Sequence, residues 1–189
     1  YMFAMISAFL PSKEGDGLRR VAGNVGFRSE DMYGNTYRNG LLHSYDDKPA
    51  KILYGEIKEW YKEGKRHRDG DKPAYIYKGR KEWYKNGKLY SIQFPNGTRQ
   101  WYKEGKLHRE GDLPAVVKPD GTKYWYKNGE LHRDCDKPAI IDRDVREWWV
   151  NGVCHRDCDK PAFISKNYRV WYRHGQRHRD YGKPALVKF

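Results

Sequence analysis

The chain has 189 residues and a formal net charge of +13, from 38 lysines and arginines against 25 aspartates and glutamates. A hydrophobic content of 38% is too low for a deep two-layer core, but 16 tyrosines, 7 tryptophans and 6 phenylalanines are more than a disordered chain carries. No run approaches the roughly 18 apolar residues of a membrane helix, so the composition excludes a transmembrane protein and predicts a wet surface over a core of rings.

Residues 1–35 lack the repeated phrase of the later chain, and we predict an irregular N-terminal cap there. Tyr1 to Leu10 are apolar, but no basic segment precedes them and Pro11 follows, so a secretory signal is not expected. Three cysteines make no disulfide framework, which favours an intracellular, reducing compartment, the cytoplasm or nucleus. Met32, Tyr33 and Tyr37 are expected to begin the sheet.

Residues 36–189 repeat one phrase, Trp-Tyr-Lys-x-Gly-Lys-x-His-Arg, with few changes. Its first tryptophan recurs at spacings of 23, 18, 24, 23 and 23, and Tyr37 to Ala50 form a weaker first copy. Such a period indicates a repeat architecture of six to seven units, each of about 23 residues. The structural repeat positions are Trp60, Trp83, Trp101, Trp125, Trp148 and Trp171, with His43, His67, His108, His132, His155 and His178.

Each unit has a glycine after an Asn, Glu or His at its centre, as in Asn86-Gly87, which is typical of a two-residue hairpin turn. Such a turn pairs its flanking residues across the hairpin. The expected pairs are Tyr61 with Arg66, Lys62 with Lys65, Trp60 with His67, Tyr102 with Leu107 and Trp101 with His108.

The 18-residue unit that starts at Trp83 explains the longer ones. Lys88 to Phe94 form one strand, Pro95 to Gly97 a turn, and Thr98 to Trp101 the next strand. The longer units add about five residues after the histidine, ending in Asp-x-Pro-Ala. We call the stretch from histidine to alanine the insert, and its proline predicts a bulge or loop that repeats on one side. The predicted fold is all-β: an elongated antiparallel meander of tandem β-hairpin repeats in one continuous sheet over residues 36–189.

The phrase in Trp83 to Leu89, Trp-Tyr-Lys-Asn-Gly-Lys-Leu, resembles the MORN repeat, and the resemblance covers residues 37–189. The form with His-Arg and Asp-x-Pro-Ala is similar to MORN-like proteins of giant DNA viruses of amoebae. The resemblance implies hairpin repeats without catalytic activity and a role in protein or membrane association. It also implies action on a host component in an infected cell, or packaging in the virion. The inserts depart from the better-known MORN form, which weakens the expectation of membrane binding.

The histidines of the phrase return in every regular unit, whereas an active site is built once. We therefore interpret them as structural, each ring beside a tryptophan and bonded to the backbone of the insert. The alternative is a pH-sensitive row, because unperturbed histidine titrates near pH ~6.5.

In the units at Trp60, Trp101, Trp125 and Trp148, the arginine after the histidine lies three residues before the aspartate of the insert, as Arg68 does before Asp71. This spacing predicts a local bidentate bond that fixes the insert. The alternative is a row of free guanidinium groups that binds phosphate or a partner. The arginines of this row are Arg68, Arg109, Arg133, Arg156 and Arg179, the last with Gly182 in place of the aspartate.

Lysines flank the turns, and like charges opposite one another destabilise a hairpin. They are expected to align along one edge, either as protection against strand addition or as a binding surface for a polyanion or partner. This candidate stripe comprises Lys62, Lys65, Lys85, Lys88, Lys103, Lys106, Lys127 (opposite Glu130) and Arg173.

Cys135, Cys154 and Cys158 lie near His132 and His155, but no Cys-x-x-Cys pair supports zinc. Cys135 and Cys158 hold equivalent places about 10 Å apart, beyond disulfide reach, so we expect free thiols that fill a bulge. We predict no catalytic residue, no metal and no cofactor.

The leading hypothesis is a non-enzymatic scaffold that binds a protein partner, with no small-molecule substrate. The alternative is direct binding of nucleic acid, chromatin or an anionic membrane surface, which rests on the charge of +13 and the pI near 9.5.

Overall fold

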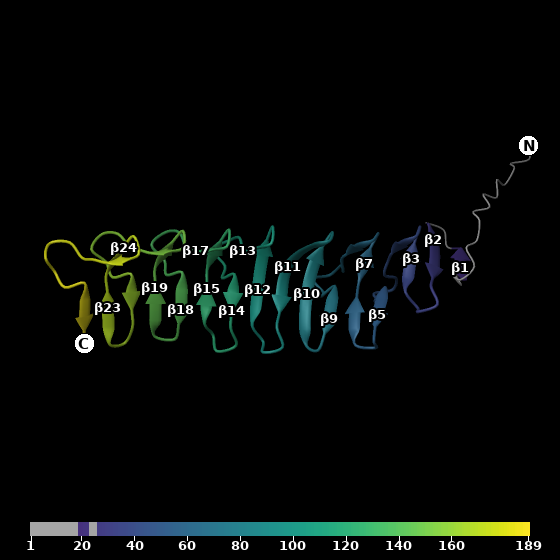
Figure 1. The fold of residues 1–189 in the computed structure, drawn as a ribbon, viewed down its shortest axis with the longest axis horizontal. Helices are drawn as coiled ribbons and strands as arrows, with labels where there is room; N and C mark the ends of the chain where they lie inside the picture. Colours follow the sequence, from purple (N-terminus) through teal and green to yellow (C-terminus); the bar gives the residue numbers. More distant parts are fainter. Residues whose placement is uncertain (1–18, 23–25) are drawn as a thin grey trace, which may run out of the picture.

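The structure, a computed structural model, describes residues 19–22 and 26–189 of the chain. The described residues contain strands, turns and loops but no helix. The strands follow one another along the molecule in chain order, from β1 (Arg19–Ala22) at one end to β26 (Leu186–Lys188) at the other (Figure 1). All pairings among the described strands are antiparallel and the order of the main sheet follows the chain, so the predicted all-β meander of tandem hairpins is confirmed.

The main sheet has 14 strands, and its order follows the chain from β5 to β26. Four two-stranded hairpins are left out of this order because the chain leaves the sheet after Trp60, Trp125, Trp148 and Trp171. The sheet contains β5 (Lys51–Leu53), β6 (Ile57–Glu59), β9 (Tyr75–Tyr77), β10 (Arg80–Lys85), β11 (Lys88–Gln93), β12 (Arg99–Lys103), β13 (Lys106–Leu107), β14 (Val116–Val117), β15 (Lys123–Tyr124), β18 (Ile140–Asp142), β19 (Val145–Glu147), β22 (Phe163–Ile164), β23 (Tyr168–Val170) and β26.

Four of the predicted turns lie in the separate hairpins. Register pairs Tyr61 with Arg66 and Lys62 with Lys65, as expected. Both turn residues have positive φ, 50° at Glu63 and 75° at Gly64, which is the geometry that matches the twist of two-residue hairpins. The hairpins are β7 (Tyr61–Lys62) with β8 (Lys65–Arg66), β16 (Tyr126–Lys127) with β17 (Glu130–Leu131), β20 (Trp149–Val150) with β21 (Val153–Cys154), and β24 (Tyr172–Arg173) with β25 (Gln176–Arg177).

A second sheet of four strands precedes the main one: β1, β2 (Phe27–Glu30), β3 (Thr36–Arg38) and β4 (Leu41–Leu42). Strands therefore occur inside the segment expected to be an irregular cap, whose residues 1–18 and 23–25, Tyr1 to Leu10 among them, lie outside the described residues. Met32 and Tyr33, expected to begin the sheet, lie instead in an exposed turn. Ladder pairing does not continue from β3 to β5, where Thr36 N–H bonds to Ala50 C=O, so residues 36–189 form two sheets and separate hairpins rather than one continuous sheet.

The core is a row of tryptophans and alanines, one of each per regular unit. Trp125 is 7% exposed and Ala139 fully buried, and the Trp125 backbone N–H bonds to the Ala139 carbonyl at 2.8 Å. Small alanines let each insert return closely to the next ring. No helix among the described residues is long and apolar enough to cross a membrane.

Candidate functional site on the insert edge

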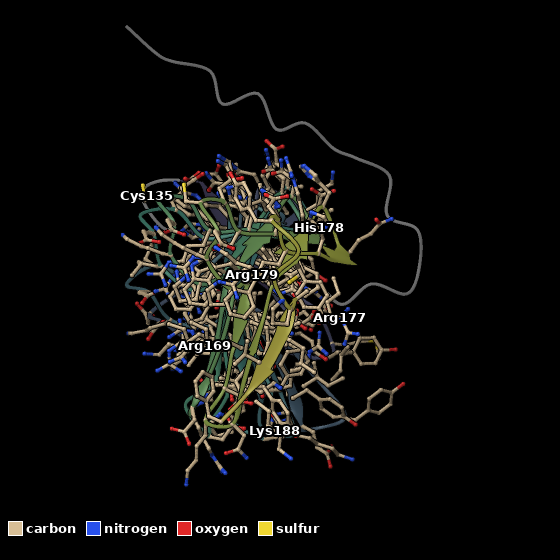
Figure 2. The ribbon with its side chains drawn as sticks, turned by 90° about the vertical axis from the view of Figure 1, so that its left-hand side faces the viewer. Cys135, Arg169, Arg177, His178, Arg179 and Lys188 are labelled. Carbon is tan, nitrogen blue, oxygen red and sulfur yellow. The ribbon has the colours of Figure 1, made fainter. Side chains whose placement is uncertain are left out.

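The hairpin turns and the inserts lie along the same long edge of the molecule, the upper one in Figure 1. We call it the insert edge. Viewed along the sheet, His178 lies toward this edge and Lys188 toward the opposite one (Figure 2). Consecutive inserts enclose similar clefts of about 350, 320, 300 and 290 Å³. Their linings repeat the same residue types, so size and chemistry do not single out one of these clefts.

Each arginine of the phrase stacks on the tryptophan of its own unit. The Arg133 guanidinium carbon lies 3.8 Å from the centre of the Trp125 ring, and Arg156 lies 3.7 Å from Trp148. Cation–π contact of this kind is stronger when the cation is shielded from water. These arginines are 14% exposed, so the rings and guanidinium groups form one packed layer.

The same arginines bond to the aspartate of the preceding insert. Arg133 donates from Nε to Asp112 Oδ1 at 2.7 Å and from Nη2 to Oδ2 at 3.2 Å. The prediction of a local bond to the aspartate three residues later is therefore wrong: within its own insert, Arg133 instead donates to the Pro138 carbonyl at 3.2 Å. The same bonding to the preceding insert joins Arg68 to Asp47, Arg156 to Asp136 and Arg179 to Asp159.

One aspartate thus holds three groups of the next unit. The Asp112 backbone carbonyl accepts from Trp125 Nε1 at 3.0 Å, and its carboxylate also accepts from Lys137 Nζ at 2.7 Å. Hydrogen bonds from Arg133 and Lys137 lower the pKa of Asp112 to about 2. The corresponding arginines and lysines lower the pKa values of Asp136 and Asp159 to about 2 as well. The guanidinium row is consequently occupied in these units.

The histidines bridge consecutive units. His132 Nδ1 accepts from the backbone N–H of Asn151, the first turn residue of the next unit, at 3.1 Å. Its Nε2 lies 2.8 Å from Asp134 Oδ1. An accepting Nδ1 places the proton of the neutral ring on Nε2, which then donates to the carboxylate. The expected bond to the insert backbone is therefore wrong: the ring bonds to the next turn and to a side chain of the insert. His43, His67, His108 and His155 also accept at Nδ1 from the next turn.

Half of the lysine stripe is paired with acidic residues of the inserts. Lys103 lies 2.7 Å from Glu110, Lys127 3.2 Å from Asp134 and Arg173 3.2 Å from Asp180. Lys62 lies 3.5 Å from Asp69. All these side chains are at least half exposed, and pairs of this kind contribute little to stability. The pairs nevertheless neutralise part of the positive charge on the strand that precedes the turn in their units.

Four other lysines have no carboxylate within 4.0 Å among the described residues: Lys65, Lys85, Lys88 and Lys106. The side chain of Lys65 packs against the next turn: its Cβ lies 3.6 Å from the position that a Cβ would take at Gly87. Lys85 and Lys88 face each other across that turn. Lysines of two consecutive units are thereby brought together at one place on the insert edge.

The unit that begins at Trp83, which we call the short unit, breaks this pattern. It has no insert, since β11 continues from Lys88 to Gln93 without leaving the sheet. Arg109 of the following unit stacks on Trp101 at 3.7 Å but has no carboxylate within 4.0 Å among the described residues. Of the five arginines predicted to bind or pair, Arg109 differs from Arg68, Arg133, Arg156 and Arg179 in this respect.

The cysteines are free thiols. Cys154 is 8% exposed, and its burial raises the pKa of the thiol to about 12. Cys135 and Cys158 do not fill a bulge as expected. They lie exposed in a turn of their inserts, each at φ 63°, where Gly70 and Gly111 stand in other units. Figure 2 labels Cys135. No cluster of three or more metal-ligating side chains occurs within residues 26–189.

Sequence reasoning missed a second set of contacts on the sheet. Glu59, 4% exposed, accepts from Tyr61 Oη at 2.9 Å and pairs with Arg66. Glu82, 7% exposed, accepts from Tyr84 Oη and from Arg80 Nε, both at 2.6 Å. The signal was available as a glutamate before and a tyrosine after the tryptophan, two residues apart on one face of a strand.

The fold and its insert edge define a class: an all-β array of tandem hairpin units, in which units that carry an insert bond to the next unit through Trp, Arg, Asp and His side chains. Comparison with protein-family models, with curated proteins and with solved structures gives no match. The resemblance to MORN repeats therefore stays a prediction.

Proposed function

We propose that the protein is a non-enzymatic scaffold whose insert edge binds a protein partner. The supporting observation is the repeated use of the reactive side chains: the same histidine and arginine bonds recur from unit to unit. Groups that hold units together in this way are not free to act on a substrate. A long edge of near-identical clefts is suited to a large partner.

The setting that the resemblance implies, an infected host cell or the virus particle itself, belongs to this proposal. So does the absence of catalysis and of a small-molecule substrate.

Cross-linking with mass spectrometry tests the scaffold function in lysate of the native cell. We expect one protein to cross-link at inserts of several consecutive units. A variant lacking one regular unit, residues 125–147, should keep its fold and lose the cross-links of that unit and part of the capture. Capture that is unchanged by this deletion, or no specific partner at all, contradicts the proposal.

A second candidate function is polyanion binding, which the grouping of Lys65, Lys85 and Lys88 favours. Binding to a short duplex DNA should then weaken steeply as salt rises, because neutralised phosphates release counterions. Charge reversal to glutamate at Lys65, Lys85, Lys88 and Lys106 should abolish it. Reversal at Lys58, Lys78, Lys123 and Lys166, which do not flank the insert-edge turns, is the control of equal charge. Equal loss in both variants would mean that net charge, not the lysine group, carries the binding.

A further inference from the structure

The short unit interrupts the stacking of the insert edge. In regular units the turn glycine donates its backbone N–H to the preceding unit, as Gly129 does to Leu107 and Gly152 does to Leu131, both at 2.9 Å. Gly105, the turn glycine after the short unit, makes no such bond among the described residues, and a Cβ there would meet nothing within 4 Å. The main sheet continues through this point by β10, β11 and β12. The interruption is confined to the edge.

We call this interruption of the insert edge, beside Trp101 and Arg109, the gap. Two hydrogen-bond donors that bond to the preceding insert in the regular units, an indole Nε1–H and an arginine guanidinium, have no preceding insert to bond to here. Trp101 Nε1 has no acceptor within the described part of the chain, and the ring is only half-buried. The equivalent nitrogen of Trp60, Trp83, Trp125, Trp148 and Trp171 donates to the carbonyl of an insert aspartate. Arg109 lacks the carboxylate that its counterparts have, because the insert that would carry it is absent.

The surroundings of Arg109 add positive charge. The Arg99 guanidinium lies 4.9 Å from the Trp101 ring on which Arg109 stacks. Burial first, and then the charge of Arg99, lower the pKa of Arg109. Neither arginine has a carboxylate within 4.0 Å among residues 26–189. An anion placed here would relieve this repulsion.

The other side of the gap is closed differently. Asp71 carries the carboxylate whose arginine would lie in the missing insert, and it accepts instead from Tyr90 Oη at 3.0 Å. Burial and this bond raise the pKa of Tyr90 to about 12. Asp71 therefore has a hydrogen-bond partner within the chain, whereas Arg109 has no carboxylate partner among the described residues.

The regular units show which group fits the open side. A single aspartate there supplies both a backbone carbonyl for the indole and a bidentate carboxylate for the guanidinium. A free phosphate could bond to Arg109 but offers no polypeptide carbonyl. In the regular units a lysine such as Lys137 also bonds to the aspartate. Leu113, 47% exposed, stands at the equivalent position in the unit of Arg109. The open site therefore combines an apolar wall with a guanidinium pair.

We propose that this gap binds an aspartate-bearing peptide segment of a partner protein. The carboxylate of that aspartate bonds to Nε and Nη2 of Arg109, and its backbone carbonyl accepts from Trp101 Nε1. The segment takes the place that an insert takes in the regular units. This inference deepens the scaffold function, on which it rests for the existence of a protein partner, and its peptide test can fail while the cross-linking test succeeds.

The test uses a fluorescent peptide with the sequence of residues 68–75, which contains Asp71 in its Asp-Lys-Pro-Ala context. Binding to the whole protein is followed by anisotropy at low salt, and the peptide with Asn in place of that aspartate is the ligand control. A charge-assisted bidentate bond is worth enough that the Asn peptide should bind about tenfold or more weakly. Equal binding of both peptides, or no saturable binding, overturns the proposal.

Three protein variants locate the site. Arg109→Gln should lose about tenfold or more in affinity, whereas Arg133→Gln, whose guanidinium already has Asp112, should retain the affinity of the unsubstituted protein. Leu113→Lys restores the second cation beside an intact Arg109 and should tighten binding about threefold or more. Equal affinity of Arg109→Gln and Arg133→Gln contradicts the assignment, and so does weaker binding by Leu113→Lys.

A spectroscopic readout separates the aspartate site from a simple anion site. In the ¹H–¹⁵N spectrum, the indole signal of Trp101 should shift on addition of the peptide while those of the other six tryptophans stay in place. Inorganic phosphate should leave that indole signal unchanged. If phosphate shifts it equally and displaces the peptide, the gap is an anion site without preference for aspartate, and the proposal is wrong.

Discussion

The unit at Trp125 and the unit at Trp101 share one sequence phrase but differ in what closes them. Trp125 is covered by Arg133 and by the insert before it, with Asp112 joining the two. Trp101 has the stacked Arg109 but no preceding insert, and its ring is half-buried. The difference shows that stacking of the arginine on the tryptophan needs residues of one unit only. Burial of the ring and the hydrogen bond of its Nε1 need the insert of the unit before it. Loss of one insert therefore opens a site one unit further along the chain.

The largest contrast is expected from the two rings. Trp125→Ala should lower the free energy of unfolding by about 3–5 kcal/mol, as large-to-small changes in a core do. Trp101→Ala should cost about 2 kcal/mol, because its ring is less buried and its Nε1 bonds to nothing within the described chain. Urea unfolding followed by circular dichroism measures both. Equal losses would mean that the insert adds nothing to the burial of the ring.

Substitution of the two arginines should lower the free energy of unfolding in the same order, by smaller amounts. Arg133→Gln removes a bidentate bond and a cation–π contact and should cost about 1–2 kcal/mol. Arg109→Gln removes the cation–π contact and one bond to a carbonyl and should cost about 0.5–1 kcal/mol. Urea midpoints of the two variants at pH 7 check the order. A larger loss for Arg109→Gln would show that Arg109 has a strong partner within the chain.

Acid should unfold the regular units through their aspartates. The pKa values of Asp112, Asp136 and Asp159 are about 2 in the folded chain, below the ordinary value of 3.8. Because the folded pKa is the lower one, this stabilisation is complete above about pH 4 and is lost as the pH falls toward 2. The urea midpoint should decrease across that window, and the decrease should be smaller when all three are changed to Asn. An unchanged slope in that triple variant would mean that other carboxylates cause the acid unfolding.

The smallest effect concerns the turn at the tip of an insert. Cys135 has φ 63°, which costs a side chain about 1–2 kcal/mol in general. Cys135→Gly should therefore stabilise the protein by about 0.5–1 kcal/mol after the entropy that glycine loses on folding. Cys135→Ser keeps the backbone strain and is the control, with no change expected in thermal unfolding. Stabilisation by serine alone would assign the effect to the thiol.

Sequence reasoning went furthest where the chain repeats itself. The two-residue turns, the register around Lys62 and Lys65 and the continuous strand after Lys88 all follow from spacing, and the structure confirms them. These features depend on neighbours within one unit. Local rules of turn geometry and pairing are sufficient to predict them.

Spacing within the sequence did not predict the contacts between consecutive units. Arg133 has Asp136 three residues later in the sequence, but the fold brings Asp112, 21 residues earlier, to its guanidinium. Only the path of the insert decides between the two aspartates, and spacing along the chain does not give that path. The open donors at Trp101 and Arg109 were not predicted for the same reason, since the insert of their own unit departs from that of the Trp60 unit only at Glu110 and Leu113.

The most direct test of this contrast is hydrogen exchange at arginine Nε–H and tryptophan Nε1–H, followed by NMR near pH 6. The Nε–H groups of Arg68, Arg133, Arg156 and Arg179, bonded to aspartates, should exchange slowly, as should the indoles of the regular units. Arg109 and Trp101 should exchange rapidly and become protected when the aspartate peptide is added. Slow exchange at Arg109 without any ligand, or fast exchange throughout the row, would contradict the account.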